Sequence, residues 1–366
     1  MIVLDAAGMR ALDARQSAEH GDVSLMRAAG DALATLTQQY APGRRIAGVA
    51  GPGNNGGDVF AALAVLPRSF ERAVFALPAR EESNARKDAV ARARTAGVET
   101  RPIASVADLA GLADADLILD GLLGAGSRLP LSAPFDGIAS GINAAGPPVL
   151  AVDLPSGIDV SNGAVDPHAV RALATVTLGA LKLGLLLDPA REAVGELWFA
   201  PIGFPSTPVD SNVVAHCLDD AEFRALLPAR KTNADKRSAG APLVLGGSEQ
   251  FPGAVVLCAR GAARAGAGYV TVATPSSAAA AVRAHLIEQV VVTYDERDVE
   301  KAVEHIIELE NHCSALAIGP GLGLSEETGT LMREVIRRSN LPMVIDASGL
   351  FHLSEHLDVL HRKRAV

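Results

Sequence analysis

The chain has 366 residues, is 49% hydrophobic but only 4% aromatic, and carries a formal net charge of −9 at pH 7. This length is sufficient for two domains, and the acidic balance argues against a nucleic-acid partner, which usually requires a basic face. The first residues lack a basic segment followed by a long apolar run, so we expect a cytoplasmic protein without a membrane partner.

Short apolar runs alternate with helical patterns over the first 200 residues. Two helices are predicted within 7–40, and the apolar runs that follow show little polar alternation, which is typical of strands buried on both faces of a parallel sheet. The predicted strands lie within 44–51, 72–79, 115–124, 147–157 and 171–182, and the helices between them within 58–69 and 84–97. We therefore expect an α/β domain with a doubly wound parallel sheet.

A second α/β domain is predicted after a linker. Three prolines and small polar residues at 201–212 indicate that linker, and a second alternating set of elements follows it. Its predicted strands lie within 241–248, 269–276, 312–323 and 341–350, and a helix is predicted within 253–268. The expected domains are thus 1–211 and 212–366.

Polar residues follow three of the predicted strands in the first half. The segments are GPGNNGGD at 51–58, DGLLGAGSRLP at 120–130 and VDLPSGIDVSNG at 152–163. Because the carboxyl ends of neighbouring parallel strands open on one crevice, we expect these side chains to lie together.

These segments suit an anion beside a cation. Glycines let the backbone approach a ligand closely, and a helix that opens at Asp58 would present free N–H groups to a phosphate. The oxygen donors Asn55, Asp120 and Ser156 suit a hard cation. Asp153, with Lys182 as a helper, would carry out proton transfer.

Each segment taken alone also has an ordinary structural explanation. Asn54 and Asn55 could form Asx turns, Asp58 could be a helix N-cap, and Asp153 could cap a turn before Pro155. Three polar strand ends in one half favour a site instead. The pattern GxxxxGK[ST] does not occur in that half, so a P-loop is not supported.

In this order, the three segments resemble those of the NAD(P)H-hydrate epimerase domain, as do MRALD at 9–13 and LMRAAG at 25–30. Residues 236–275, with AIGPGLG at 317–323, resemble the ADP- or ATP-dependent NAD(P)H-hydrate dehydratase domain. The whole chain thus resembles bifunctional NAD(P)H-hydrate repair enzymes. The resemblance implies a Rossmann-like three-layer epimerase domain followed by a truncated ribokinase-like domain.

The resemblance also implies the ligands and the residues that hold them. The substrates would be NADHX and NADPHX, potassium would be held by Asn55, Asp120 and Ser156, and ADP or ATP with Mg²⁺ would serve the dehydratase half. The catalytic residues would be Asp153 and Lys182, and a homo-oligomer is common in such proteins. The hydrate-binding residues would be Asn54, Asn55, Gly56, Gly57, Asp58, Gly124, Ala125, Gly126, Ser127, Arg128, Leu129, Pro130 and Asp153, with Ala254 and Gly323 in the second domain.

The second half departs from the family pattern. The sequence lacks three segments of the family: a TPHPGE-like, a KGxxT-like and a GGTGD-like one. The family's DADAL-like stretch is replaced by DASGL from Asp346. Asp235 stands before Lys236, at a position where the family often has histidine. The family's GTGD-type turn supplies a catalytic aspartate. Epimerase activity is therefore expected, and dehydratase activity from this chain alone is doubtful.

Two other functions stay open at this point. A non-catalytic nucleotide- or protein-binding module could keep the same fold, and the second half alone is compatible with a ribokinase-like small-molecule kinase. The kinase would need a catalytic aspartate in a GxGD turn, which does not occur. A substitution of Asp153 separates a catalyst from a binding module.

Overall fold

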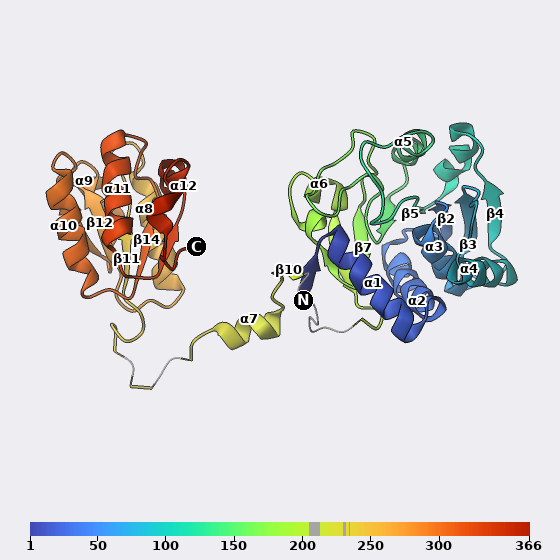
Figure 1. The fold of residues 1–366 in the computed structure, drawn as a ribbon, viewed down its shortest axis with the longest axis horizontal. Helices are drawn as coiled ribbons and strands as arrows, with labels where there is room; N and C mark the ends of the chain where they lie inside the picture. The colour runs from blue at the N-terminus through green and yellow to red at the C-terminus, as the bar shows by residue number, and fades with distance from the viewer. Residues whose placement is uncertain (205–212, 230–231, 234) are drawn as a thin grey trace. The chain divides into compact units, whose positions relative to one another are not determined.

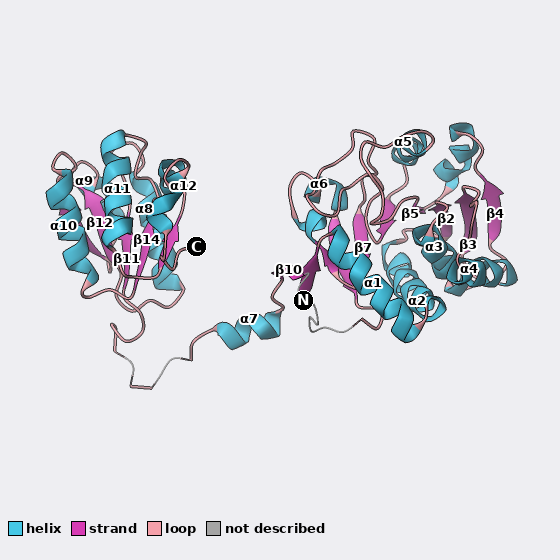
Figure 2. Ribbon diagram, in the orientation of Figure 1, coloured by secondary structure: helices cyan, strands magenta, loops and turns pink. Residues whose placement is uncertain are grey.

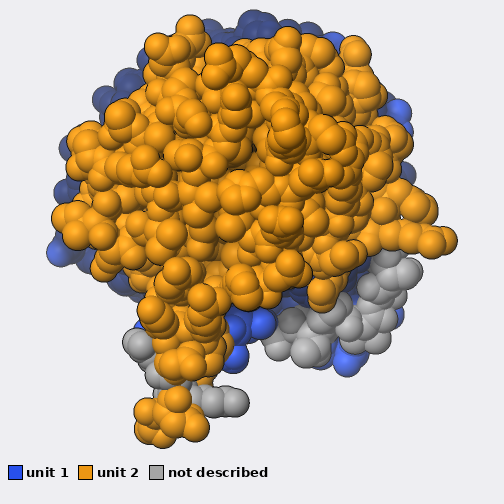
Figure 3. Space-filling model, turned by 90° about the vertical axis from the view of Figure 1, so that its left-hand side faces the viewer, with its two compact units in different colours: residues 1–226 blue, residues 227–366 orange. Residues whose placement is uncertain are grey.

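The computed structural model describes residues 1–204, 213–229, 232–233 and 235–366 (Figure 1). The described residues form two compact units, 1–226 and 227–366, which Figure 3 colours separately. The domain boundary expected near residue 212 lies outside the described residues. Among those residues, no helix combines the length and apolar character needed to cross a bilayer.

A seven-stranded parallel sheet forms the centre of the first unit (Figure 2). Its strand order is β4-β3-β2-β5-β6-β7-β9, so the order reverses between β2 and β5. The five predicted strands are present, and two edge strands are added to them. The strands are β2 (Arg45–Ala50), β3 (Glu71–Ala76), β4 (Glu99–Pro102), β5 (Leu117–Gly121), β6 (Val149–Val152), β7 (Ala174–Leu178) and β9 (Glu196–Ala200).

Helices cover both faces of this sheet, which confirms the predicted three-layer α/β fold. On one face α2 (Asp22–Tyr40), α3 (Asn54–Val65) and α4 (Asn84–Thr95) bury the larger apolar cluster. On the other face α5 (Phe135–Ala145) and the 3₁₀ segment η1 (Val106–Asp114) bury a second one. The sheet is thereby buried on both sides, as its unbroken apolar strands require.

A small second sheet joins the start of the chain to the region after β7. The strand β1 (Ile2–Leu4) runs parallel to β8 (Leu181–Lys182) and antiparallel to β10 (Val213–His216). The segment 171–182, predicted as one strand, forms two, because a turn at Gly179 (φ +76°) ends β7 and directs the chain into this other sheet as β8. The pairing of Leu4 with Lys182 places the following helix, α1 (Ala6–His20), next to that lysine.

The second unit is another parallel α/β structure, as predicted. Its strand order is β13-β12-β11-β14-β15, with α8 and α9 packed on one face and α10 and α11 on the other. The strands are β11 (Pro242–Leu245), β12 (Thr271–Pro275), β13 (Val290–Tyr294), β14 (Ala315–Ile318) and β15 (Met343–Ile345). The helices are α8 (Pro252–Arg264), α9 (Ala279–His285), α10 (Val299–Glu310), α11 (Glu326–Arg338) and α12 (Ser348–Leu353). The remaining short elements are α6 (Arg191–Val194), η2 (Leu183–Leu186), α7 (Asp220–Leu226) and η3 (Leu357–Leu360).

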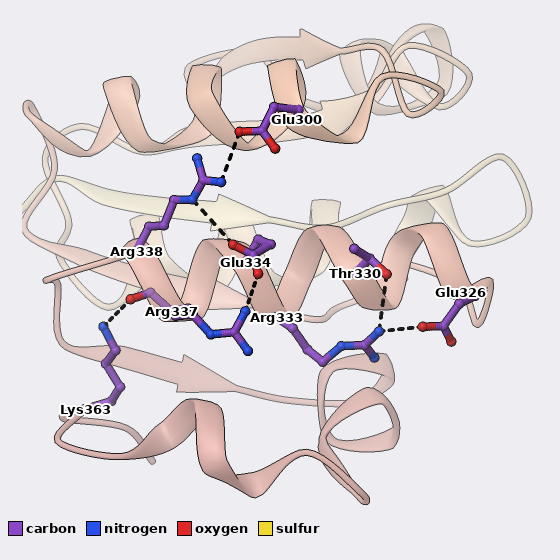
Figure 4. A network of polar contacts seen from close by, with 8 residues as sticks. All are labelled: Glu300, Glu326, Thr330, Arg333, Glu334, Arg337, Arg338 and Lys363. Atoms are coloured by element: carbon purple, nitrogen blue, oxygen red, sulfur yellow. Dashed lines mark hydrogen bonds and ion pairs between the residues drawn. The ribbon is translucent and has the colours of Figure 1, made fainter.

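Polar contacts at the carboxyl end of α11 fasten the last residues of the chain to this unit (Figure 4). Lys363 Nζ donates to the backbone oxygens of Arg337 at 2.9 Å and Ser339 at 2.7 Å. Arg338 bridges from α11 to Glu300 of α10 at 3.1 Å. The lysine occupies the negative end of the helix dipole, a favourable place for a cation, while the exposed ion pairs contribute little stability.

Candidate functional site

A cleft of about 530 Å³ opens at the carboxyl ends of the central strands of the first unit. It adjoins the place where the strand order reverses between β2 and β5, which is where open α/β sheets commonly bind ligands. The turns after β2 and β5, Asp153 after β6, and Lys182 of β8 form one side. Helices α1 and α2 form another side, through residues that include Met9, Arg10, Asp13, Ser17, Asp22 and Met26.

The amino end of α3 faces this cleft. This helix begins at Asn54, with Gly53 as its N-cap, so the expectation that a helix opens at Asp58 is wrong. Gly56 and Gly57 disfavour a helix by propensity, but their neighbours leave no room for side chains: a Cβ at Gly56 would meet Gly51 O at 2.2 Å. The first N–H groups of α3 have no intrahelical acceptor and can serve an anion.

Asp153 and Lys182 form a fixed ion pair on the floor of the cleft. Asp153 has a positive φ of 69°, an unfavourable conformation for a non-glycine residue. Its Oδ1 accepts from Lys182 Nζ and from Leu178 N at 3.0 Å. Lys182 Nζ also donates to Leu178 O at 2.7 Å, and the lysine is completely buried. The carboxyl group, 16% exposed, is thus the part of the pair that a ligand in the cleft can reach.

Asp120, Ser156 and Asn55 meet around the turn that follows β5. Ser156 donates to both carboxyl oxygens of Asp120 at 2.8 Å, through its N–H and its hydroxyl. Leu123 N donates to Ser156 Oγ at 2.9 Å, and Asn55 Nδ2 donates to Leu123 O at 2.8 Å. Burial raises the pKa of Asp120, and the hydrogen bonds from Ser156 and Leu122 act in the opposite direction. The group offers oxygen donors only, which fits a hard cation such as potassium.

Two further carboxyl groups, Asp13 and Asp58, line the same cleft. Burial, with the nearby charge of Asp153 adding to it, raises the pKa of Asp58 well above its ordinary value of 3.8. Burial also raises the pKa of Asp13 to about 6, although its side chain opens on the cleft; the charge of Lys182 lowers it and that of Asp153 raises it. The cleft is thus lined by four carboxyl groups, those of Asp13, Asp22, Asp58 and Asp153, and by one ammonium group.

The structure does not bring every expected residue into the cleft. Asn54, Asn55, Asp58, Asp153 and Lys182 line it, together with the loop Gly124, Ala125, Gly126 and Ser127. Gly56 and Gly57 lie behind it as packing glycines, and Asp120 and Ser156 are buried beneath the loop. Arg128, Leu129 and Pro130 are not among its lining residues, and Arg128 is exposed.

Ala254 and Gly323 lie in the second unit, near the carboxyl ends of β11 and β14. Ala254 lies in the first turn of α8 and Gly323 in the loop after β14, and the two segments adjoin, because a Cβ at Gly321 would lie 3.1 Å from the Cβ of Ala254. His352 Nε2 is 3.0 Å from Gly323 O and holds the loop after β14. A cavity of about 90 Å³ nearby is lined by Ser248, Pro275, Ser277, Tyr294, Glu296, Leu322, Glu327, Thr328 and Leu331, and by neither Ala254 nor Gly323.

Two residues that shape the cleft are not identified by the sequence patterns. Asp13 belongs to the MRALD segment without standing out in it, and Arg86 lies within an ordinary helical pattern. Arg86 Nη1 donates to Gly51 O at 2.7 Å and to Gly53 O at 2.8 Å, so this buried side chain fixes the turn before α3. No local sequence signal distinguishes either residue from a solvated helix position, because both roles depend on contacts with distant segments.

Comparisons with known proteins agree with this division of the chain. Residues 23–184 match the family described as YjeF-related protein N-terminus, and residues 242–366 match the family described as NAD(P)H-hydrate dehydratase. A Salinibacter ruber protein named bifunctional NAD(P)H-hydrate repair enzyme Nnr is 32% identical over 99% of this chain and 72% of its own length. A Pyrobaculum aerophilum protein of the same name is 36% identical over 89% of this chain and 66% of its own length. The chain thus spans about two thirds of the length of these relatives.

Two similar solved structures each cover a part of this chain. The crystal structure of the yeast protein ynu0 has 20% identity and a TM-score of 0.49, and it covers 58% of this chain and 98% of its own. The Bacillus subtilis ADP/ATP-dependent NAD(P)H-hydrate dehydratase, co-crystallised with ATP and Mg²⁺, is 31% identical over 36% of this chain and 45% of its own, with a TM-score of 0.31.

Proposed function

This chain belongs to the family of bifunctional NAD(P)H-hydrate repair enzymes, and we propose that its first unit interconverts the R and S epimers of NADHX and NADPHX. The observation that carries the proposal is the Asp153–Lys182 pair, which lies in one cleft with the amino end of α3. An acid–base group beside an anion-binding helix end suits a substrate that joins a reactive ring to a diphosphate.

The substrate's chemistry defines what the cleft must do. Water that adds to the enamine double bond of a reduced nicotinamide places a hydroxyl group on the carbon bonded to the ring nitrogen. The nitrogen lone pair can expel that hydroxyl group if a proton reaches the departing oxygen. Re-addition of water to the other face of the ring gives the other epimer, provided that a base accepts a proton from the water.

We assign the roles as follows. The free N–H groups at Asn54–Gly56 and the loop Gly124–Ser127 hold the diphosphate and ribose, and Asp153 transfers a proton at the ring. Lys182 keeps the Asp153 carboxyl group in place through its hydrogen bond to Oδ1. Asn55, Asp120 and Ser156 would hold potassium, which supplies positive charge beside the bound diphosphate.

We propose dehydratase chemistry, driven by ADP or ATP with Mg²⁺, only as the family's second reaction. Within the 366 residues of the chain, Ala254 of α8 and the Gly323 loop are present, and a GGTGD-like turn, which supplies the family's catalytic aspartate, does not occur. The epimerase reaction is therefore the one whose proposed groups all lie within the described residues. A binding module is the second candidate, because the same cleft could hold the ligand without turnover.

A mixture of R- and S-NADHX tests these assignments. Chromatography follows the two epimers while absorbance follows recovery of the reduced nicotinamide, each with and without ADP or ATP. Epimer exchange without nucleotide supports the epimerase, and recovery of absorbance only with nucleotide supports the dehydratase. Binding of the hydrate with neither change would leave the binding module and refute the epimerase.

A further inference from the structure

The helix α1 brings one face to the wall of the cleft. Met9, Asp13 and Ser17 are spaced four residues apart, which places them on one side of a helix, and all three line the cleft. The parallel pairing of Leu4 with Lys182 fixes where this helix starts, and Asp5 caps its first turn by accepting from Gly8 N at 2.8 Å. Asp13 is thereby held in the cleft by a rigid element, not by a loop.

The epimerisation proposed above needs two protic groups, and Asp153 supplies only one. Its Oδ1 already accepts from Lys182 and Leu178, so in the resting pair it is a proton acceptor. Lys182 is fully buried and directs its ammonium group to Asp153 and Leu178 O. A second group must give a proton to the oxygen that leaves the opposite face of the ring.

The lining residues narrow the choice of this second group. The guanidinium group of Arg10 suits binding of an anion more than proton transfer, and Ser17 and Ser127 are too weakly acidic to act without a partner. Asp58 sits on α3 among the proposed phosphate-binding groups, and its carboxyl is only partly exposed. Asp13 and Asp22 come from other elements than Asp153, and both side chains are open to the cleft. Asp13 is the one on which the charges of both Lys182 and Asp153 act.

We propose that Asp13 is the second proton-transfer residue of the cleft and works with Asp153 in an acid–base pair. This inference rests on the epimerase function proposed above. Asp13 gives its proton to the departing hydroxyl group as the carbon–oxygen bond breaks and the nitrogen lone pair forms the carbon–nitrogen double bond. Water then adds to the other face, and its proton passes to Asp153. The reverse reaction uses the same two groups with their roles exchanged, and between successive turnovers in one direction the proton returns from Asp153 to Asp13 through water.

The electrostatic surroundings of Asp13 agree with this role. The charged groups that share the cleft with it are Arg10, Asp22, Asp58, Asp153 and Lys182. Burial raises the pKa of Asp13 to about 6, near the pH at which a general acid works best. The pair formed by Asp13 and Asp153 is active when it carries one proton in total. Activity therefore falls at high pH, where the pair loses this proton, and at low pH, where it gains a second one.

The test compares the wild-type chain with Asp13→Asn and with Asp31→Asn. Asp31 is an exposed residue of α2 outside the cleft, and its variant makes the same change of charge. We expect Asp13→Asn to lower kcat for R/S exchange by about 100-fold or more, the usual contribution of a general acid or base, with KM within about threefold of the control. Wild-type kcat/KM should also fall about tenfold per pH unit above about pH 6, and this decline should vanish in Asp13→Asn.

Each other outcome overturns the inference. An Asp13→Asn variant with a kcat near that of Asp31→Asn, or one that changes KM alone, would show that Asp13 transfers no proton. Trp198 fluorescence shows whether Asp13→Asn folds. If it does not fold, Asp13→Glu and Asp13→Gln are compared instead, and we expect epimer exchange only in the glutamate variant. A wild-type chain without epimer exchange would refute the proposed function itself, whereas an active wild type with an active Asp13→Asn would refute only this inference.

Discussion

The buried ion pair between Asp153 and Lys182 should contribute measurably to the stability of the first unit. Lys182→Met removes the ammonium group, keeps most of the side-chain volume and leaves the Asp153 carboxyl without its cationic partner. Removing one partner of a buried pair costs about 3–5 kcal/mol. The lower end applies here because Asp153 is 16% exposed and retains the Leu178 N–H as donor. We therefore expect the first unit to lose about 3 kcal/mol of unfolding free energy.

Trp198 makes this loss measurable for the first unit alone. It is the chain's single tryptophan and lies on β9, with its Nε1 donating to Tyr40 Oη at 2.6 Å. With a urea dependence of about 2 kcal/mol per molar, the midpoint followed by Trp198 fluorescence should fall by about 1.5 M. Lys87→Met, on the exposed side of α4, should leave it within about 0.25 M, as surface changes usually do. A fall of less than about 0.5 M in Lys182→Met would refute the reasoning.

Three other perturbations have defined outcomes. Arg86→Met leaves the backbone oxygens of Gly51 and Gly53 without their donor and should lower the free energy of unfolding by about 2 kcal/mol in the same urea assay. It should also raise KM for NADHX. An unchanged KM would show that the turn before α3 does not depend on this side chain. The raised pKa of Asp13 destabilises the folded state as pH rises from about 4 to about 6; the full shift is worth about 3 kcal/mol, and screening at this exposed group reduces it to about 1 kcal/mol. Asp13→Asn should therefore gain about 1 kcal/mol relative to wild type at pH 7 compared with pH 4 in urea titrations, and an equal difference at both pH values would contradict this. Replacing potassium by tetramethylammonium should raise KM in wild type and have much less effect in Asp120→Asn. A wild-type KM that is the same with both cations would show that potassium does not bind at this site.

The sheet was predictable from the sequence where its strands are apolar on both sides. β2, β5, β6 and β7 are almost entirely buried, and their unbroken apolar runs indicated them. The edge strand β4 is exposed at all four residues and has no such pattern. The short strand β1 was missed and β8 was predicted as part of β7, because each consists of two or three residues that are strands only through pairing with distant segments.

Part of the site can likewise be predicted from local sequence patterns, and part depends on contacts between distant segments. Asn54, Asn55, Asp58 and Asp153 follow strands, so the geometry of a parallel sheet is sufficient to predict that they share one crevice. The predicted start of α3 is wrong because helix propensity disfavours glycine. Gly56 is nevertheless helical, since its close packing against Gly51 leaves no room for a side chain. Asp13 reaches the cleft because β1 pairs with β8, a contact between residues almost 180 positions apart that no local pattern reveals.

The central claim is that Asp153 performs acid–base chemistry on the hydrate ring in this cleft, and one measurement tests it most directly. Purified wild-type chain and Asp153→Asn are incubated with R-NADHX, and the appearance of S-NADHX is followed by chromatography, with binding of the hydrate measured in parallel. We predict rapid exchange in wild type and a loss of about 100-fold or more in Asp153→Asn, while the hydrate still binds. Exchange at the wild-type rate in Asp153→Asn would contradict the account.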